Sequence, residues 1–102
     1  MKNEDVYNYL TKIPKGKVVT YGQIGEYFGN RHLARRIGNI LHVNPDPINK
    51  PCYKVVNSKG ELALNFGDGG RDAQKKRLEA DDIQVINYKV DLTKYQWDSQ
   101  TR

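Results

Sequence analysis

Three prolines stand close together just ahead of the only cysteine in the chain, at positions 45, 47 and 51. Each proline fixes its own φ angle and moves the preceding residue toward an extended conformation. We therefore expect the stretch from Asn44 to Cys52 to be a rigid loop that sets the position of the thiol. A thiol held in this way is available for chemistry, although a lone cysteine is more often a small buried hydrophobic residue.

The length and charge of the chain limit the classes of function. With 102 residues, we expect one domain over 1–102 with a single site. A single cysteine cannot form an internal disulfide, and neither a leader nor a long apolar run is visible. These features predict a soluble protein of the cytoplasm, or of the nucleus in a eukaryote, that contacts no membrane. The net charge of +5 makes a polyanion the natural partner. We expect a monomer with no metal and no cofactor.

A first helix is predicted near the start of the chain by apolar residues at helical spacing. Asn3 is suited to the N-cap position, and Pro14 ends the helix. The face toward the core is expected to hold Val6, Tyr9, Leu10 and Ile13. A turn at 14–17 then leads into a short extended piece at 18–19.

Two further helices follow in a helix-turn-helix pattern. Thr20 and Gln23 form a capping-box pair at the start of the first, and Gly29 suits the left-handed position at its end. Asn30 can cap the second helix. The inward residues are expected to be Ile24, Tyr27 and Phe28 on the first helix and Leu33, Ile37, Ile40 and Leu41 on the second.

The second of these helices begins with basic turns, which carry Arg31, His32, Arg35 and Arg36. Basic residues at this place reach phosphates and base edges when the helix enters a DNA groove. The alternative is a solvated surface that carries several arginines. Gly38 in the helix interior costs about 1 kcal/mol relative to alanine, which predicts that another backbone packs closely against it.

A small β-hairpin is predicted after the proline loop. Val55–Val56 and residues 62–64 are apolar, and they flank a turn-rich connection at 57–60. The predicted fold class is therefore mostly α with a small β-hairpin, in a winged-helix-like, helix-turn-helix DNA-binding domain.

A strongly charged helix and an aromatic tail complete the chain. The helix is expected to end at about Asp82, and Lys75–Arg77 add to the basic surface. Its inner face is expected to hold Ala73, Leu78 and the stem of Lys76. In the tail, Tyr95 and Trp97 are expected to cover the core rather than to stack on a base.

Three sequence blocks, at 13–24, 34–39 and 44–56, resemble the DNA-binding, active-site domain of the O6-alkylguanine-DNA alkyltransferases, also called methylated-DNA-protein-cysteine methyltransferases. The blocks read IPKGKVVTYGQI, ARRIGN and NPDPINKPCYKVV. The remainder of the chain looks more like the alkyltransferase-like relatives of these enzymes, including the DGG loop at 68–70, the KKRLEA helix at 75–80 and the closing residues at 95–97. The resemblance implies double-stranded DNA containing O6-alkylguanine as the partner, with the second helix of the pair in the minor groove.

The resemblance implies roles for residues around the cysteine. Cys52 matches the alkyl acceptor, whose thiolate attacks the carbon on guanine O6. Tyr53 stands where the family has the histidine of a proton relay, and the place of the relay glutamate falls on Asp81 or Asp82. Alkyltransferase-like proteins usually replace the acceptor cysteine, so this chain combines features of both branches.

DNA-binding roles are implied in the same way. Arg35 matches the arginine that fills the gap left in the duplex by a flipped guanine, which offsets part of the cost of extrusion. Tyr21 matches the tyrosine that presses the phosphate of the target, and Asn44 matches the asparagine that ties the recognition helix to the active-site loop. The DNA-binding set is completed by Arg36, Asn39 and Lys54, the last of which replaces an arginine.

The preferred interpretation is a repair protein that flips O6-alkylguanine and holds it beside Cys52, with slow or absent alkyl transfer. A tyrosine with its ordinary pKa near 10 is a poor base at neutral pH, which disfavours fast transfer. Such a protein could flag damage for other repair proteins. The alternative is a fully active, single-use methyltransferase. A third hypothesis, a sequence-specific helix-turn-helix regulator, leaves the proline and cysteine loop unexplained.

Overall fold

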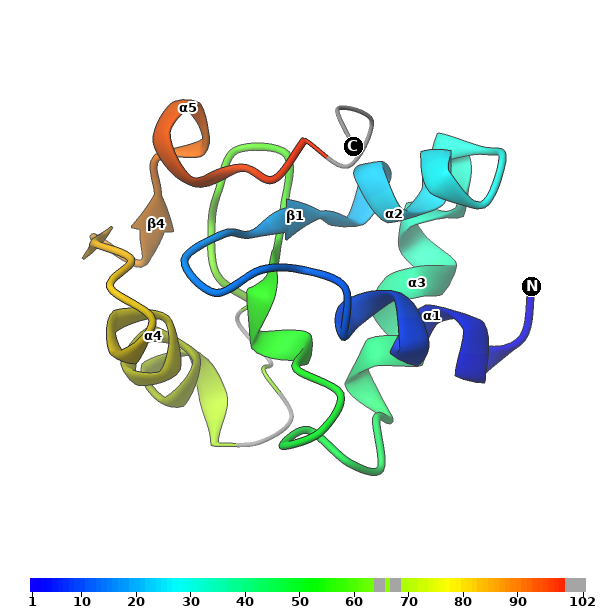
Figure 1. The fold of residues 1–102 in the computed structure, drawn as a ribbon, viewed down its shortest axis with the longest axis horizontal. Helices are drawn as coiled ribbons and strands as arrows, with labels where there is room; N and C mark the ends of the chain where they lie inside the picture. The colour runs from blue at the N-terminus through cyan, green and yellow to red at the C-terminus, as the bar shows by residue number, and fades with distance from the viewer. Residues whose placement is uncertain (64–65, 67–68, 99–102) are drawn as a thin grey trace.

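The computed structural model describes residues 1–63, 66 and 69–98, and places them in short helices around two small sheets (Figure 1). The helices are α1 (Asn3–Leu10), α2 (Tyr21–Tyr27), α3 (Ala34–His42), α4 (Gly70–Ala80) and α5 (Leu92–Tyr95), with the 3-10 turns η1 (Arg31–Leu33) and η2 (Cys52–Lys54). The strands are β1 (Val19–Thr20), β2 (Val55–Val56), β3 (Val85–Ile86) and β4 (Lys89–Val90). The predicted class, mostly helical with a helix-turn-helix pair, is confirmed.

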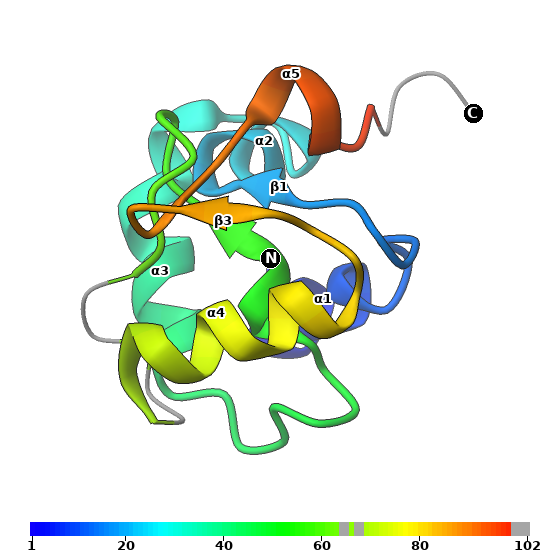
Figure 2. The same cartoon turned by 90° about the vertical axis from the view of Figure 1, so that its left-hand side faces the viewer.

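The parallel pair of β1 and β2 lies at the centre of the fold, with α1, α2 and α3 on one side and α4 on the other (Figures 1 and 2). Successive residues of a strand point to opposite faces of a sheet. Val19 and its partner Val55 therefore enter a first core cluster, formed with α1, α2 and α3. Val18 and Val56 enter a second core cluster, formed with α4 and the β3–β4 strands. The sheet divides the interior into two cores.

α1 buries its predicted apolar face in the first core. Val6, Tyr9, Leu10 and the following Ile13 are at most 3% exposed. The helix begins differently from the prediction, because Lys2 and not Asn3 holds the N-cap position. The carboxylate of Asp5 accepts a hydrogen bond from the Lys2 N–H at 2.7 Å. This bond is the backbone half of a capping box.

Side-chain caps begin the helix-turn-helix pair as predicted. Thr20 Oγ1 accepts from the Gln23 N–H at 3.1 Å, and Gln23 Oε1 accepts from the Thr20 N–H at 3.3 Å. Gly29 has a φ of 101°, the left-handed conformation expected after α2. Asn30 Oδ1 accepts from the His32 N–H at 2.9 Å and so caps η1, which continues into α3.

The predicted hairpin between β2 and residues 62–64 is wrong. The turn at 57–60 does form, closed by a backbone hydrogen bond of 2.9 Å, but β2 pairs with β1. Leu62 donates its N–H to the Tyr88 carbonyl at 2.9 Å, and the antiparallel hairpin of the structure is β3 with β4. The two residues that connect β3 to β4, Asn87 and Tyr88, both have positive φ. The turn at 57–60 was predictable from its residue types. The pairing of β2 with β1 was not, because it depends on the burial of Val19 and Val55, which are distant in sequence. The last residue of 62–64 lies outside the described residues.

Two inward side chains were assigned wrongly. Tyr27 is 42% exposed, and its ring lies on that of Tyr9 with the ring centroids 4.7 Å apart. On α4, the stem of Lys76 is exposed, while Gln74 is fully buried beside Leu78. Gln74 and Leu78 are one helical turn apart, so both point into the second core.

The tail covers both cores, as predicted. Trp97 packs against the first core and Tyr95 against the second. The Val18 N–H donates to the Tyr95 carbonyl at 2.9 Å, and the Trp97 N–H donates to the Val18 carbonyl at 2.8 Å. The tail thus runs from α5 along the free side of β1 toward α2 (Figure 1).

Close contacts around the helix pair involve two glycines. The prediction that another backbone packs against Gly38 is wrong. Among the described residues, only the ring of Tyr21 comes within 4 Å of a Cβ added at Gly38, at a distance of 3.9 Å. The close backbone approach occurs instead at Gly25 in α2. An added Cβ there would lie 2.8 Å from the Asn30 carbonyl oxygen and 3.1 Å from the Arg31 Cα. The turn between α2 and α3 therefore requires glycine at position 25.

We expect Gly25→Ala to lower the free energy of unfolding by about 2 kcal/mol, because the backbone between α2 and α3 must move to admit the methyl group. Gly22→Ala in the same helix is the matched control, since an added Cβ there has no neighbour within 4 Å. That control should leave stability unchanged or raise it by up to about 1 kcal/mol. Urea unfolding of both variants measures the difference, and equal midpoints would contradict the close approach at Gly25.

Candidate functional site

A cavity of about 620 Å³ lies between the helix-turn-helix pair and the α4 side of the molecule. Its lining includes Tyr21, Gly38, Asn39 and His42 from α2 and α3, Cys52 and Val55 from η2 and β2, and Phe66, Arg71, Gln74 and Tyr88 from the opposite wall. Apolar and aromatic groups with a few hydrogen-bonding side chains are typical of sites for small organic groups. The cysteine singled out in the sequence lies in the wall of this cavity.

The loop before Cys52 is held by its own hydrogen bonds. Asn44 Nδ2 donates to the Lys50 carbonyl at 2.7 Å, and Asn44 Oδ1 accepts from the Asp46 N–H at 3.0 Å. The same Lys50 carbonyl accepts from the Cys52 N–H at 2.8 Å. Lys50 Nζ also donates to Asn8 Oδ1 of α1 at 3.0 Å. Asn44 follows α3, so these bonds join the end of that helix to the turn that carries the thiol.

Tyr53 is bonded to Asp81 across the second core. Its hydroxyl donates to Asp81 Oδ2 at 2.6 Å. Burial raises the pKa of Tyr53 well above its ordinary value, and the hydrogen bond to Asp81 raises it further. Tyr53 packs against the second core, while Cys52 packs against the first. The hydroxyl is therefore protonated at neutral pH and points at Asp81, so it is not a base for the thiol.

Lys54 lies in the protein interior. Its side chain is 8% exposed, and its ammonium donates to the Ile13 carbonyl at 2.8 Å. Burial lowers the pKa of Lys54, and the nearby Asp81 carboxylate opposes this effect. The sequence predicted Lys54 as a DNA contact. In the structure its charged end instead joins η2 to the chain after α1.

Tyrosines from two helices surround the thiol. Tyr7 donates its hydroxyl to the Ile40 carbonyl at 2.8 Å, which ties α1 to α3. The pKa values of Tyr7 and Tyr21 are raised by burial and by the negative charge that Cys52 can carry nearby. Sequence reasoning found Tyr21 but missed Tyr7, because Tyr7 lies at the edge of the helical stripe formed by Val6, Tyr9 and Leu10.

Gln74 is a second buried residue that the sequence analysis did not select. Its Nε2 donates to the carbonyls of Tyr53 and Val55, each at 3.0 Å, and its Oε1 accepts from the Ala63 N–H at 2.9 Å. All of these partners belong to the walls of the cavity or to η2 beside it. The signal that could have found Gln74 is its spacing of four residues from the buried Leu78.

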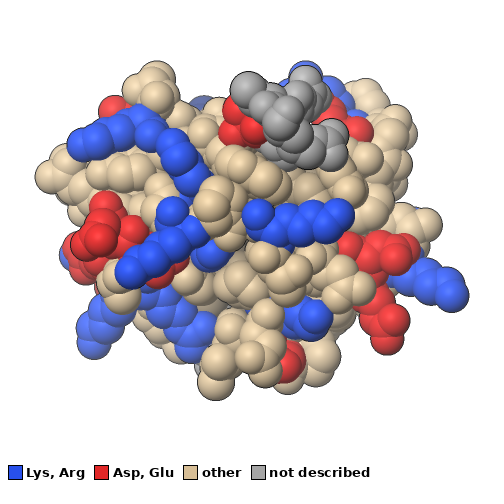
Figure 3. Space-filling view, in the orientation of Figure 1, with Lys and Arg blue, Asp and Glu red and all other residues tan. Residues whose placement is uncertain are grey.

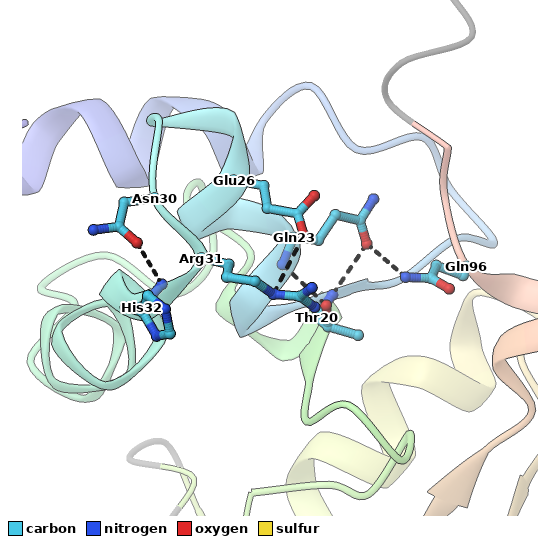
Figure 4. Close-up of polar contacts among 7 residues, drawn as sticks. All are labelled: Thr20, Gln23, Glu26, Asn30, Arg31, His32 and Gln96. Atoms are coloured by element: carbon cyan, nitrogen blue, oxygen red, sulfur yellow. Dashed lines mark hydrogen bonds and ion pairs between the residues drawn. The ribbon is translucent and has the colours of Figure 1, made fainter.

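The surface of the helix pair is basic and exposed. Arg31, Arg35 and Arg36 are exposed, as is Asn39, which also lines the cavity. Arg31 forms an exposed ion pair with Glu26, with Nε and Oε1 3.4 Å apart (Figure 4). Basic side chains also spread over the face that carries α4 and α5 (Figure 3). Positive charge therefore extends beyond the helix pair.

The described part of the chain, residues 1–63, 66 and 69–98, has no group of three or more His, Cys, Asp and Glu side chains placed to hold a metal ion. None of its helices is long and apolar enough to cross a membrane.

Comparisons with known proteins agree with this geometry. A DNA base-flipping protein of Vibrio parahaemolyticus is 39% identical over 93 residues, which cover 90% of this chain and 91% of that protein. Alkyltransferase-like protein 1 of Schizosaccharomyces pombe is 35% identical over 98 residues, which cover 90% of each. A crystal structure of S. pombe Atl1 in complex with damaged DNA containing O6-carboxymethylguanine matches with a TM-score of 0.85 and 32% identity, over 94% of both chains.

The family model of the DNA-binding domain of 6-O-methylguanine DNA methyltransferase matches residues 2–83. The matched range contains the helix pair, the proline loop, Cys52 and all of α4. The chain therefore belongs to the family of the 6-O-methylguanine DNA methyltransferase DNA-binding domain.

Proposed function

We propose that this chain acts as a single-domain repair protein that binds DNA through α2 and α3, and holds a flipped O6-alkylguanine in the cavity beside Cys52. Alkyl transfer to the thiol is slow or absent. The observation that carries the proposal is the position of Cys52 in the wall of a cavity that also contains Tyr21 and Asn39 of the basic helix pair. The names of the similar proteins, with base flipping and damaged DNA among them, support it.

Arg35 and Tyr21 act on the duplex in this proposal. Arg35 is exposed on α3 and fills the space left by the extruded base. Extrusion costs a few kcal/mol of stacking and pairing, and an inserted side chain offsets part of that cost. Tyr21 begins α2 and presses a phosphate near the target. Arg36 and Asn39 add contacts from α3, and Asn44 keeps the loop of Cys52 attached to the end of that helix.

The residues at the two relay positions do not act as the base for alkyl transfer. The thiol must lose its proton before the sulfur attacks the alkyl carbon, the carbon–oxygen bond breaks, and the guanine takes up a proton. Tyr53 is protonated and bonded to Asp81, so neither residue accepts the proton directly from Cys52. Asp82 is exposed. The protein therefore recognises the lesion better than it repairs it.

A fully active methyltransferase is the second candidate, and Cys52 itself is the observation that favours it, because the thiol lines the cavity. A sequence-specific regulator is less well supported, because it gives no use to a cavity beside a cysteine. In either leading case the protein belongs in the compartment that holds DNA, the cytoplasm or the nucleus. Other repair proteins would complete the process where transfer is absent.

Arg35→Ala should weaken binding to a duplex with O6-methylguanine about tenfold more than binding to the undamaged duplex, since only the flipped state uses this side chain. Arg36→Ala removes the same charge from the next residue and should weaken both about equally. Fluorescence anisotropy at one fixed salt concentration measures the affinities. A 2-aminopurine reporter beside the lesion measures extrusion, and an unchanged signal in Arg35→Ala would remove the assigned role.

Tyr53→His should accelerate alkyl transfer to Cys52 by about a hundredfold or more, because an imidazole titrates near neutral pH and can act as a general base. Its ring nitrogens lie closer to the backbone than the tyrosine hydroxyl does, so a water molecule is needed to connect the imidazole to Asp81 and to the thiol. Mass spectrometry of the Cys52 peptide after incubation with methylated duplex measures the transfer.

The matched control is Tyr53→Phe, which loses the hydrogen bond to Asp81 and gains no base, so its transfer should stay as slow as in the parent. Cys52→Ser should keep nearly the full affinity for the alkylated duplex. Rapid stoichiometric methylation of the parent protein would contradict the proposal in favour of the active methyltransferase.

A further inference from the structure

The segment Tyr95–Trp97 extends the central sheet on the side of β1 that β2 does not occupy. Val18 and Gln96 form a parallel bridge, and backbone bonds of 2.9 and 2.8 Å join Val18 to Tyr95 and Trp97. The Trp97 ring packs against the first core, with its centroid 6.1 Å from that of Tyr9. This segment lies beyond residue 83, where the match to the family model ends.

Gln23 connects this segment to the start of α2 (Figure 4). Its Oε1 accepts from the Thr20 N–H at 3.3 Å, as the capping box requires, and also from Gln96 Nε2 at 2.9 Å. Its Nε2 donates to the Trp97 carbonyl. The side-chain amide of Gln23 therefore caps α2 and also forms hydrogen bonds with Gln96 and Trp97 of the tail.

The cap and the tail contact need different chemistry at position 23. A capping box accepts glutamate or glutamine, because only an acceptor is needed for the N–H of the N-cap residue. The bond to the Trp97 carbonyl needs a donor, which a carboxylate lacks. Glutamine is thus required for the tail contact and not for the helix.

We propose that Gln23, Gln96 and Trp97 are positioning residues that hold the first turn of α2, and with it Tyr21, at the wall of the cavity. Tyr21 follows Thr20 directly, and its ring packs 3.9 Å from the Cβ position of Gly38 in α3. A rotation of the first turn of α2 would move that ring relative to both α3 and Cys52. The inference rests on the proposed contact of Tyr21 with DNA.

The test uses Gln23→Glu, which keeps the cap and removes the donor to Trp97. Affinity for a duplex with O6-methylguanine should fall, because the hydrogen bond to the Trp97 carbonyl is lost. Gln84→Glu makes the same charge change at an exposed position just before β3 and controls for repulsion from DNA. Gln23→Glu should weaken binding about fivefold more than this control.

A double-mutant cycle with Tyr21→Phe separates positioning from general stability. Charge repulsion acts independently of the Tyr21 hydroxyl and adds in the double variant, whereas a loss that acts through Tyr21 does not add. In the Tyr21→Phe background, Gln23→Glu should therefore weaken binding no more than Gln84→Glu does. Gln96→Ala leaves the net charge and the helix cap intact. It should lower the affinity for DNA by a smaller factor, and this loss should also disappear in the Tyr21→Phe background. This variant replaces Gln23→Glu in the test if Gln23→Glu does not fold.

Trp97 is the single tryptophan of the chain, so its fluorescence reports the tail contact without DNA. Its emission should move to longer wavelength in Gln23→Glu and stay unchanged in Gln84→Glu. Equal affinities of these two variants, or an undiminished loss in the Tyr21→Phe background, would overturn the positioning role. If the parent showed no preference for alkylated duplex, the proposed function would fall instead, while the cycle on undamaged duplex and the Trp97 emission would still test the tail contact.

Discussion

The parallel pairing of β1 with β2 organises the rest of the molecule. The pair is only two residues long on each strand, yet each of its valines is at most 1% exposed. Val19 and Val55 pack into the first core, and Val56 packs into the second. Burial of such side chains contributes about 1.5–3 kcal/mol each. The helix pair depends on one face of the sheet and α4 depends on the other, so neither half is packed without it.

The same alternation extends into the turn that carries the thiol. Cys52 belongs to the face with α2 and α3, and Tyr53 belongs to the face with α4. The side chain of residue 53 is therefore not placed to take the proton directly from the Cys52 thiol, and a water molecule would have to carry it. The Tyr53–Asp81 bond uses this position to attach η2 to the end of α4, together with Gln74 in the middle of that helix. One side of this turn thus places the thiol in the wall of the cavity, and the other side attaches η2 to α4.

Most features set by neighbours in sequence were predictable here, and features set by distant partners were not. The Thr20 and Gln23 cap and the left-handed Gly29 depend on local backbone preferences, and both were found from residue types alone. The N-cap of α1 is an exception, because Lys2 takes the place predicted for Asn3. The partner of β2 and the buried places of Lys54 and Gln74 depend on contacts across the chain. The residue types of Lys54 and Gln74 do not indicate burial, because the hydrogen bonds that permit it come from distant parts of the chain.

The topology of β1 and β2 has a consequence for how the protein folds. Residues 21–54 form the whole connection between these parallel strands, and they include α2, α3, the proline loop and η2. Closing so long a connection costs chain entropy before the sheet contacts compensate for it, so local helices form before distant strands pair. A partly folded chain would then carry its basic helices without an assembled cavity beside Cys52. The basic helices would therefore attract DNA at an earlier stage of folding than the stage at which the cavity can hold a flipped guanine.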